Sequence, residues 1–156
     1  MKIFFKNAAF YALAIASVNT MFAASINKAV ADDFFVVVNN ANNFRGTENE
    51  AKILVRRLFL KSIKNWPGGE KAVPLSRKDF DPAQVALLTE ILEMSALEHG
   101  QHWARQKQTT GDTPPRAVGS KSILLRLIRR EPGAIGIVNG SGPSPNGVKV
   151  LMKFSN

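Results

Sequence analysis

Two hydroxyl residues stand where helices are expected to begin, and a helix start is a place where a protein can hold an anion. Thr47 lies three residues before Glu50, the spacing of a capping box, and Ser120 separates a short strand-like stretch from a helix-patterned segment. The first backbone amides of a helix lack partners within it, and the helix dipole makes that end positive. We therefore predict that Thr47 and Ser120 contact a bound oxyanion.

Ser76 and Arg77 come directly after the short apolar segment 72–75, which predicts a strand. In an open α/β sheet, ligands lie outside the carboxyl ends of the strands. An arginine there can hold an oxyanion through two parallel charged hydrogen bonds, so Ser76 and Arg77 join the predicted site. The alternative is that Thr47 and Ser120 only cap helices and that Arg77 is solvated, because Ser and Thr are preferred caps in any protein.

The sequence offers little for catalysis or for a metal. It contains neither a nucleophile-elbow pattern nor a glycine-rich phosphate loop with its lysine. The loop carboxylates Asp79 and Asp81 are explained by helix capping and solubility. His99 and His102 are three residues apart, but Gly100 lies between them at the expected end of a helix, so we interpret them as partly exposed surface histidines. We predict a protein that is not an enzyme and has no metal or cofactor.

Lysine and arginine outnumber aspartate and glutamate by 21 to 12, which gives a formal net charge of +9. A basic balance suits an anionic ligand, a membrane surface or nucleic acid. The basic residues are spread along the chain without the interleaved aromatic residues of a nucleic-acid platform, so we predict no nucleic-acid partner. The absence of cysteine excludes disulfides, thiolate metal sites and a cysteine nucleophile.

The N-terminus has the pattern of a secretory signal. Lys2 and Lys6 precede an uncharged apolar run over 8–18, which is too short to span a bilayer comfortably. The small-x-small triplet 29–31 fits a cleavage site, and a cut near 23–24 is an alternative. An uncleaved anchor or an ordinary core helix is the other explanation. We expect residues 1–31 to be a signal peptide and the protein to be periplasmic.

Without residues 1–31 the chain keeps 125 of its 156 residues, enough for one compact domain over 32–156. Because the removed segment contains three lysines and no acidic residue, the formal net charge falls from +9 to +6. A domain of this size can build a sufficient core without disulfides, so the lack of cysteine is compatible with an oxidising compartment.

Short apolar segments alternate with amphipathic ones along this domain. We expect strands at 34–38, 72–75, 116–118, 134–138 and 148–154, and helices opening after Thr47, after Asp81-Pro82 and after Ser120. The second helix is expected to stop at Gly100, which leaves 101–115 irregular. The alternation predicts an α/β fold with a mainly parallel, doubly wound sheet flanked by helices.

The chain resembles the periplasmic phosphate-binding proteins of ABC transporters, in particular short relatives the size of one lobe. The residues that carry the resemblance are 36–39 (VVVN), 58–61 (LFLK), 66–69 (WPGG), 73–75 (VPL), Trp103, 114–120 (PPRAVGS) and 132–136 (PGAIG). The resemblance implies a periplasmic-binding-protein-like domain that captures phosphate or a related oxyanion through amides, hydroxyls and an arginine. It also implies delivery of that anion to a membrane permease complex.

One loop departs from the family. Where the full-length family has a Gly-Ser-Gly-Thr type loop, this chain has Ser76-Arg77-Lys78-Asp79-Phe80-Asp81. The alternative function is therefore an exported accessory domain of the same fold that has lost the ligand and docks on an envelope protein.

Overall fold

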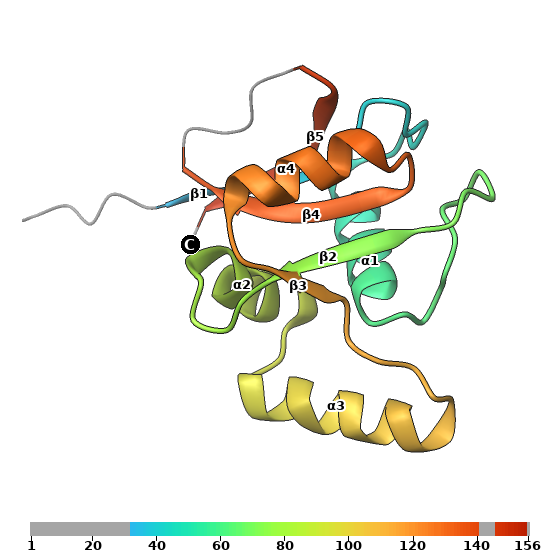
Figure 1. Ribbon diagram of the computed structural model, residues 1–156, viewed down its shortest axis with the longest axis vertical. Coiled ribbons are helices and arrows are strands. Elements are labelled where there is room, and N and C mark those ends of the chain that lie inside the picture. Colours follow the sequence, from blue (N-terminus) through green and yellow to red (C-terminus); the bar gives the residue numbers. More distant parts are fainter. Residues whose placement is uncertain (1–31, 141–145, 156) are drawn as a thin grey trace, which may run out of the picture.

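The computed structural model describes residues 32–140 and 146–155, so the predicted signal segment 1–31 lies outside the described part (Figure 1). The elements in chain order are β1 (Asp33–Asn39), α1 (Glu48–Phe59), β2 (Val73–Arg77), α2 (Pro82–Ala86), the π-helical segment η1 (Leu87–Leu92), α3 (Ala96–Thr109), β3 (Arg116–Val118), α4 (Lys121–Arg130), β4 (Ala134–Asn139) and β5 (Val148–Ser155). All five predicted strands are present. No helix in these described ranges is long and apolar enough to cross a membrane.

The sheet is mixed rather than mainly parallel, and this corrects part of the prediction. Its strand order is β3-β2-β4-β1-β5. β2 pairs in parallel with β3 and β4, whereas β1 pairs antiparallel with both β4 and β5. The predicted α/β class is confirmed. The direction of β1 could not be inferred because a strand buried on both faces is a continuous apolar run in either orientation.

Helices cover both faces of the sheet and enclose two apolar clusters (Figure 1). β1 divides its side chains between them: Val36 and Val38 face the cluster under α1, α2 and η1, and Val37 faces the cluster under α4. All three valines are fully buried. Strand alternation thus lets one short segment build both halves of the core.

A bulge in β5 changes the face that its side chains occupy. The register against β1 shifts between Val36 and Val37. Val148, before the bulge, belongs to the α4-side cluster, whereas Met152, after it, belongs to the opposite cluster. The predicted strand is confirmed, but its simple alternation is interrupted because a bulge inserts one unpaired residue.

Most of the region predicted to be irregular after Gly100 is helical, since α3 continues to Thr109, whereas 110–115 is irregular as predicted. The second helix ends earlier, at Glu93, which takes the left-handed conformation with φ 52°. Ser95 then opens α3 with its own capping box to Glu98, and Gly100 lies inside this helix. The prediction was wrong because a glycine in an exposed helix interior only weakens the helix, and the Ser95 to Glu98 spacing outweighed it.

Replacing Gly100 with alanine is expected to stabilise α3 by roughly 0.5–1 kcal/mol, the difference in helix propensity between the two residues. Apart from its chain neighbours and the backbone of its own helix, an added Cβ would meet no described atom within 4 Å, so no clash with the described part of the chain offsets the gain. Native-state hydrogen exchange should show slower exchange of the α3 amides in G100A. Equal or faster exchange would contradict the structure of α3.

Asn39 holds the C-terminal end of α4 against the end of β1. Its buried side-chain amide donates to the carbonyls of Ile128 and Arg129, at 2.7 and 3.1 Å, in the last turn of α4. Its carbonyl oxygen accepts from the amide of Ala41 at 2.8 Å. The end of β1 thus satisfies carbonyls that a helix C-terminus leaves without partners.

Candidate functional site

The parallel strands β2, β3 and β4 end at one edge of the sheet, which we call the carboxyl edge. The residues that follow them there are Lys78, Gly119-Ser120 and Gly140. The sequence predicted the site at strand ends of this kind. The structure places Ser76 and Arg77 at the last two positions of β2 and Ser120 in the connection from β3 to α4. The candidate site therefore lies at this edge.

Arg77 is buried at this edge and already holds an anion of the protein itself. Its Nε and Nη2 donate to Oδ2 of Asp81 at 3.1 and 2.6 Å, and its Nη1 donates to the carbonyl of Val118 at 3.2 Å. Only 9% of the Arg77 side chain is exposed. The other oxygen of Asp81 accepts from the amide of Ala83 at 3.0 Å and caps α2. Arg77 therefore ties β2 to β3 and α2.

Ser76 and Thr47 also have partners within the protein. Ser76 belongs to β2 rather than to the loop after it, and its hydroxyl donates to the carbonyl of Pro115 at 3.1 Å. Thr47 forms the predicted capping box: its hydroxyl and amide both donate to Glu50 Oε2, at 2.9 and 2.7 Å. Over residues 32–140 and 146–155, no hydrogen bond joins Thr47 to Ser76, Arg77 or Ser120.

Ser120 begins α4, as predicted, and caps its first turn. Its hydroxyl accepts from the amide of Ile123 at 3.3 Å and lies 3.2 Å from the Ser122 hydroxyl. The first turn of α4 contains no acidic residue. The amides of Lys121 and Ser122 have no intrahelical partner because they lie in the first turn. Two hydroxyls and these amides therefore form a neutral group of donors at the positive end of the helix.

Two lysines that the sequence analysis did not single out lie beside this helix start. Lys121 Nζ donates to the carbonyl of Asn139 at 2.8 Å, which places it between α4 and the end of β4. Lys78 lies against Gly119, since a Cβ added to Gly119 would be 3.4 Å from Lys78 Cε. Lys121 could have been identified from the sequence. A cation in the first turn of a helix lies at the positive end of the helix dipole, which is unfavourable, so it needs a compensating anion or carbonyl.

The other described α-helices begin beside a carboxylate of their own. Glu50 and Glu98 close the capping boxes of α1 and α3, and Asp81 caps α2. Hydrogen bonds from the amides of the cap residues Thr47 and Ser95 lower the pKa values of Glu50 and Glu98. These hydrogen bonds favour the charged form of a carboxylate beside each of the two helix starts. Among the described α-helices, α4 alone begins with neither an acidic cap nor an acidic first turn.

The histidine pair of α3 packs on Trp103 instead of forming a ligand cluster. Trp103 Nε1 donates to His99 Nε2 at 2.8 Å, and both imidazoles stand edge-on to the indole. In the described ranges, no group of three or more His, Asp or Glu side chains could hold a metal ion. Burial lowers the pKa of His99, with a smaller contribution in the same direction from His102 and an opposing one from Asp79.

The lowered pKa of His99 predicts a pH-dependent stability. The unfolded chain binds this proton more readily than the folded chain, so the stability present above the ordinary histidine pKa of about 6.5 is lost as the pH falls below it. Chemical denaturation should give a lower free energy of unfolding at pH 5.5 than at pH 7.5. The substitution His99→Gln should reduce this difference, because glutamine can still accept a hydrogen bond from Trp103 but does not titrate. The same loss in both proteins would contradict this assignment.

Comparisons with known proteins agree with the fold. No family model and no curated protein matches the chain. Two solved structures are similar to it at 18% identity over 77% of the chain. One is a Clostridium perfringens protein described as a phosphate ABC transporter substrate-binding protein with bound phosphate, at a TM-score of 0.57. The other is an ABC-type phosphate transport receptor from Vibrio cholerae, at a TM-score of 0.55.

The chain spans less than half the length of these structures, 44% of the first and 46% of the second. At this identity the likeness concerns the fold. The chain therefore shares its fold, over 77% of its length, with part of these two substrate-binding proteins.

Proposed function

We propose that this chain is a non-catalytic binding domain that holds phosphate or a related oxyanion at the start of α4. The observation that carries the proposal is the helix start itself, which has a neutral cap, no acidic residue in its first turn, and Lys78 and Lys121 nearby. Amides at the positive end of a helix together with ammonium groups are the donors that bind oxyanions in proteins. The fold is also shared with a protein solved with bound phosphate.

Three of the predicted site residues, Ser120, Arg77 and Ser76, have distinct roles in this proposal. The Ser120 hydroxyl and the first-turn amides contact the anion, and the two lysines balance its charge. Arg77 and Ser76 hold the β2–β3 edge in place through Val118 and Pro115. A direct contact from Thr47, Ser76 or Arg77 to the anion stays a prediction.

The setting of this binding is part of the proposal. Residues 1–31 would direct export to the periplasm, and the domain would pass its anion to a membrane permease complex or an envelope protein. The pattern of the N-terminal sequence and the fold of the phosphate receptors support this setting.

A second candidate function is an accessory domain that binds no ligand. The observation that favours it is the pairing of Arg77 with Asp81. The Asp81 carboxylate accepts hydrogen bonds from the guanidinium that the sequence predicted would bind the anion. This function predicts that phosphate produces no saturable signal with the unaltered chain.

Ser120→Asp tests the leading proposal without removing the helix cap. Aspartate caps helices as well as serine does, so the fold should be retained, while its carboxylate should weaken phosphate binding at least about tenfold by repelling the anion. Isothermal titration of phosphate into the wild-type and S120D chains measures this difference.

Ser95→Asp is the matched control, because it makes the same change at the cap of α3, far in the chain from α4. S95D should bind phosphate as tightly as the wild type. Equal phosphate affinity of S120D and the wild type would remove the start of α4 from the site.

A further inference from the structure

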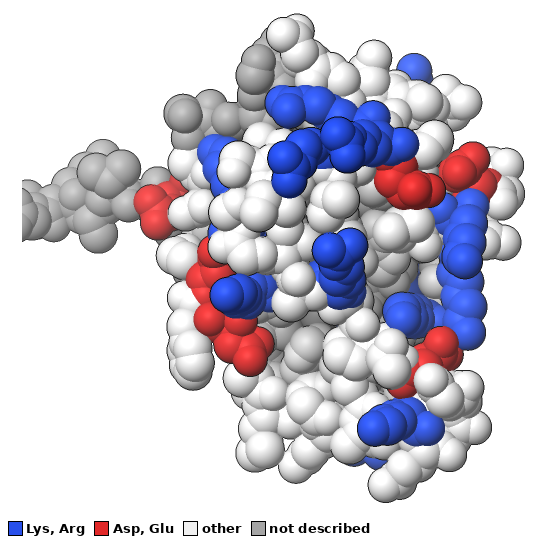
Figure 2. All heavy atoms as spheres, viewed as in Figure 1, with Lys and Arg blue, Asp and Glu red and all other residues white. Residues whose placement is uncertain are grey.

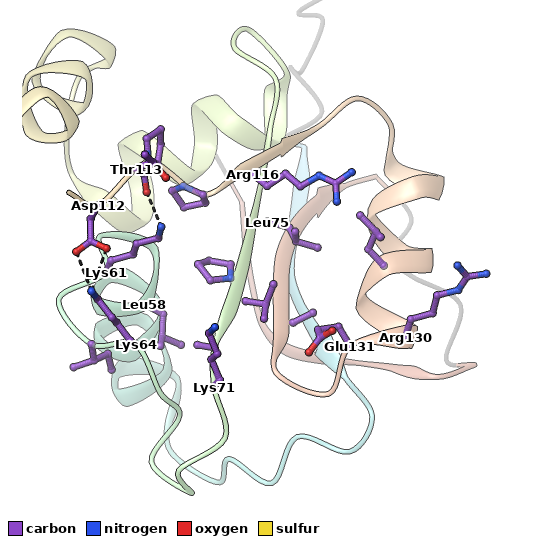
Figure 3. A pocket seen from close by; sticks show the side chains of 18 residues that line it. Leu58, Lys61, Lys64, Lys71, Leu75, Asp112, Thr113, Arg116, Arg130 and Glu131 are labelled. Atoms are coloured by element: carbon purple, nitrogen blue, oxygen red, sulfur yellow. Dashed lines mark hydrogen bonds and ion pairs between the residues drawn. The ribbon is translucent and has the colours of Figure 1, made fainter. Parts of the chain in front are cut away.

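A basic groove lies at the opposite edge of the sheet, where β2, β3 and β4 begin. It has a volume of about 800 Å³ and lies between the end of α1, the segment before β3 and the end of α4 (Figure 3). Five basic and two acidic side chains line it together with apolar residues: Lys61, Lys64, Lys71, Arg116, Arg130, Asp112 and Glu131. The groove is thus separate from the proposed anion site.

The wall of the groove on the α1 side is held in place by two lysines. Lys61 Nζ donates to the carbonyl of Thr113 at 2.6 Å, and Lys64 Nζ lies 3.0 Å from Asp112 Oδ2. These contacts join the end of α1 to the segment before β3 (Figure 3). The groove is therefore formed in the free protein, and these two lysines are already engaged.

Three other cations of the groove remain available. Lys71, Arg116 and Arg130 are exposed, and none of them lies within 4.0 Å of a carboxylate in the described ranges. In Figure 3 their charged ends do not converge on one point, since Lys71 stands apart from Arg116 and Arg130. Basic side chains also gather over α4 on this face of the molecule (Figure 2). Separated cations suit several carboxylates along one ligand better than a single phosphate ion.

The floor of the groove is apolar. Leu58, Pro74 and Leu75 are buried there, and Leu127 is half-buried. A ligand that covers this floor gains from placing apolar side chains on it. Among the described residues, no aromatic side chain lines the groove, so this part of the chain offers no stacking surface of the kind on which single-stranded nucleic acids bind.

The exposed edge of β2 in the groove cannot accept an added strand. β3 pairs with β2 only from Leu75 onward. Before that point, the amide of Ala72 already donates to the carbonyl of Lys64 at 2.9 Å, and Pro74 has no N–H group. A peptide in the groove must therefore be held by its side chains.

We infer that this groove is a docking site for an acidic peptide segment of a partner protein, in which carboxylates alternate with apolar residues. The carboxylates would pair with Lys71, Arg116 and Arg130, and the apolar residues would cover the floor around Pro74 and Leu127. Complementary charge of this kind steers association and selects the partner.

The test uses the purified full chain and fluorescein-labelled peptides in a fluorescence anisotropy titration. The first peptide alternates glutamate with leucine over ten residues, and the second replaces every leucine with serine. The first should bind saturably, and the second at least about tenfold more weakly because it cannot cover the floor. The double variant Arg116→Glu, Arg130→Glu should also bind the first peptide at least about tenfold more weakly.

Arg126→Glu is the matched control, because Arg126 is an exposed arginine of α4 that does not line the groove. It should bind the first peptide like the wild type, and circular dichroism should confirm that all variants are folded. Lys71→Glu provides a second test from another wall if the double variant does not fold.

Several results would overturn the inference. These are an absence of binding, equal binding of the two peptides, an equal loss in R126E, and full displacement of the peptide by an equal concentration of single-stranded DNA. The charge reversals should leave the phosphate titration unchanged, so failure here is distinguishable from failure of the proposed anion site.

Discussion

Replacing Gly133 with alanine is expected to destabilise the protein by more than about 3 kcal/mol, the range of severe overpacking. A Cβ on Gly133 would lie 1.8 Å from the carbonyl oxygen of Lys71, which is backbone and cannot move aside cheaply. The Gly133 carbonyl also accepts from Trp66 Nε1 at 3.0 Å and from the amide of Val73 at 2.9 Å. A backbone shift that relieves the clash would therefore disturb both the β2–β4 pairing and a buried indole.

Urea denaturation of G133A measures this loss. Gly68→Ala is the control, because an added Cβ there meets nothing within 4 Å, and its effect should stay within about 0.5 kcal/mol. Equal stability of G133A and G68A would contradict the close contact between Gly133 and the backbone carbonyl of Lys71.

Asp81→Asn is expected to lower the free energy of unfolding by about 3 kcal/mol and to make the stability of the protein depend on phosphate. Asparagine caps helices as well as aspartate, so the change removes the charge and keeps the cap. It leaves the buried guanidinium of Arg77 without its anion, and a buried charge without a partner is strongly destabilising. An external oxyanion could then take the place of the carboxylate and restore part of the loss through binding to the folded state.

Thermal unfolding of D81N in phosphate and in chloride at equal ionic strength tests this expectation. The rise in Tm caused by phosphate should be larger in D81N than in the wild type. Asp79→Asn is the control, because Asp79 is an exposed neighbour with no hydrogen bond or ion pair among the described residues. Identical responses of D81N and D79N would mean that Asp81 does not neutralise Arg77.

The parts of the fold that sequence could predict are those encoded locally. Thr47 with Glu50, Asp81 with Pro82, and Ser120 were identified as helix starts, and each cap is present. The direction of β1 and the bulge in β5 could not be predicted from the sequence, because both depend on pairing between distant segments. The start of α3 was missed although its signal, Ser95 followed by Glu98, is local.

The candidate site also has a part that the sequence could predict and a part that depends on contacts between distant segments. Strand ends placed Ser76, Arg77 and Ser120 at one edge, because parallel strands end together. The partner of Arg77 could not be predicted, since the choice between an external anion and Asp81 depends on how the loop folds back toward β3. The approach of Lys78 to Gly119 likewise depends on two segments about 40 residues apart in the sequence.

The most direct test of the account is an isothermal titration of phosphate into the full chain at low salt, with sulfate as the comparison. An anion site at the start of α4 predicts saturable heat with phosphate, with an affinity that is at least about tenfold weaker in S120D and unchanged in S95D. An absence of heat with phosphate in the wild type would contradict it and would favour an accessory domain whose internal carboxylate, Asp81, replaces a ligand.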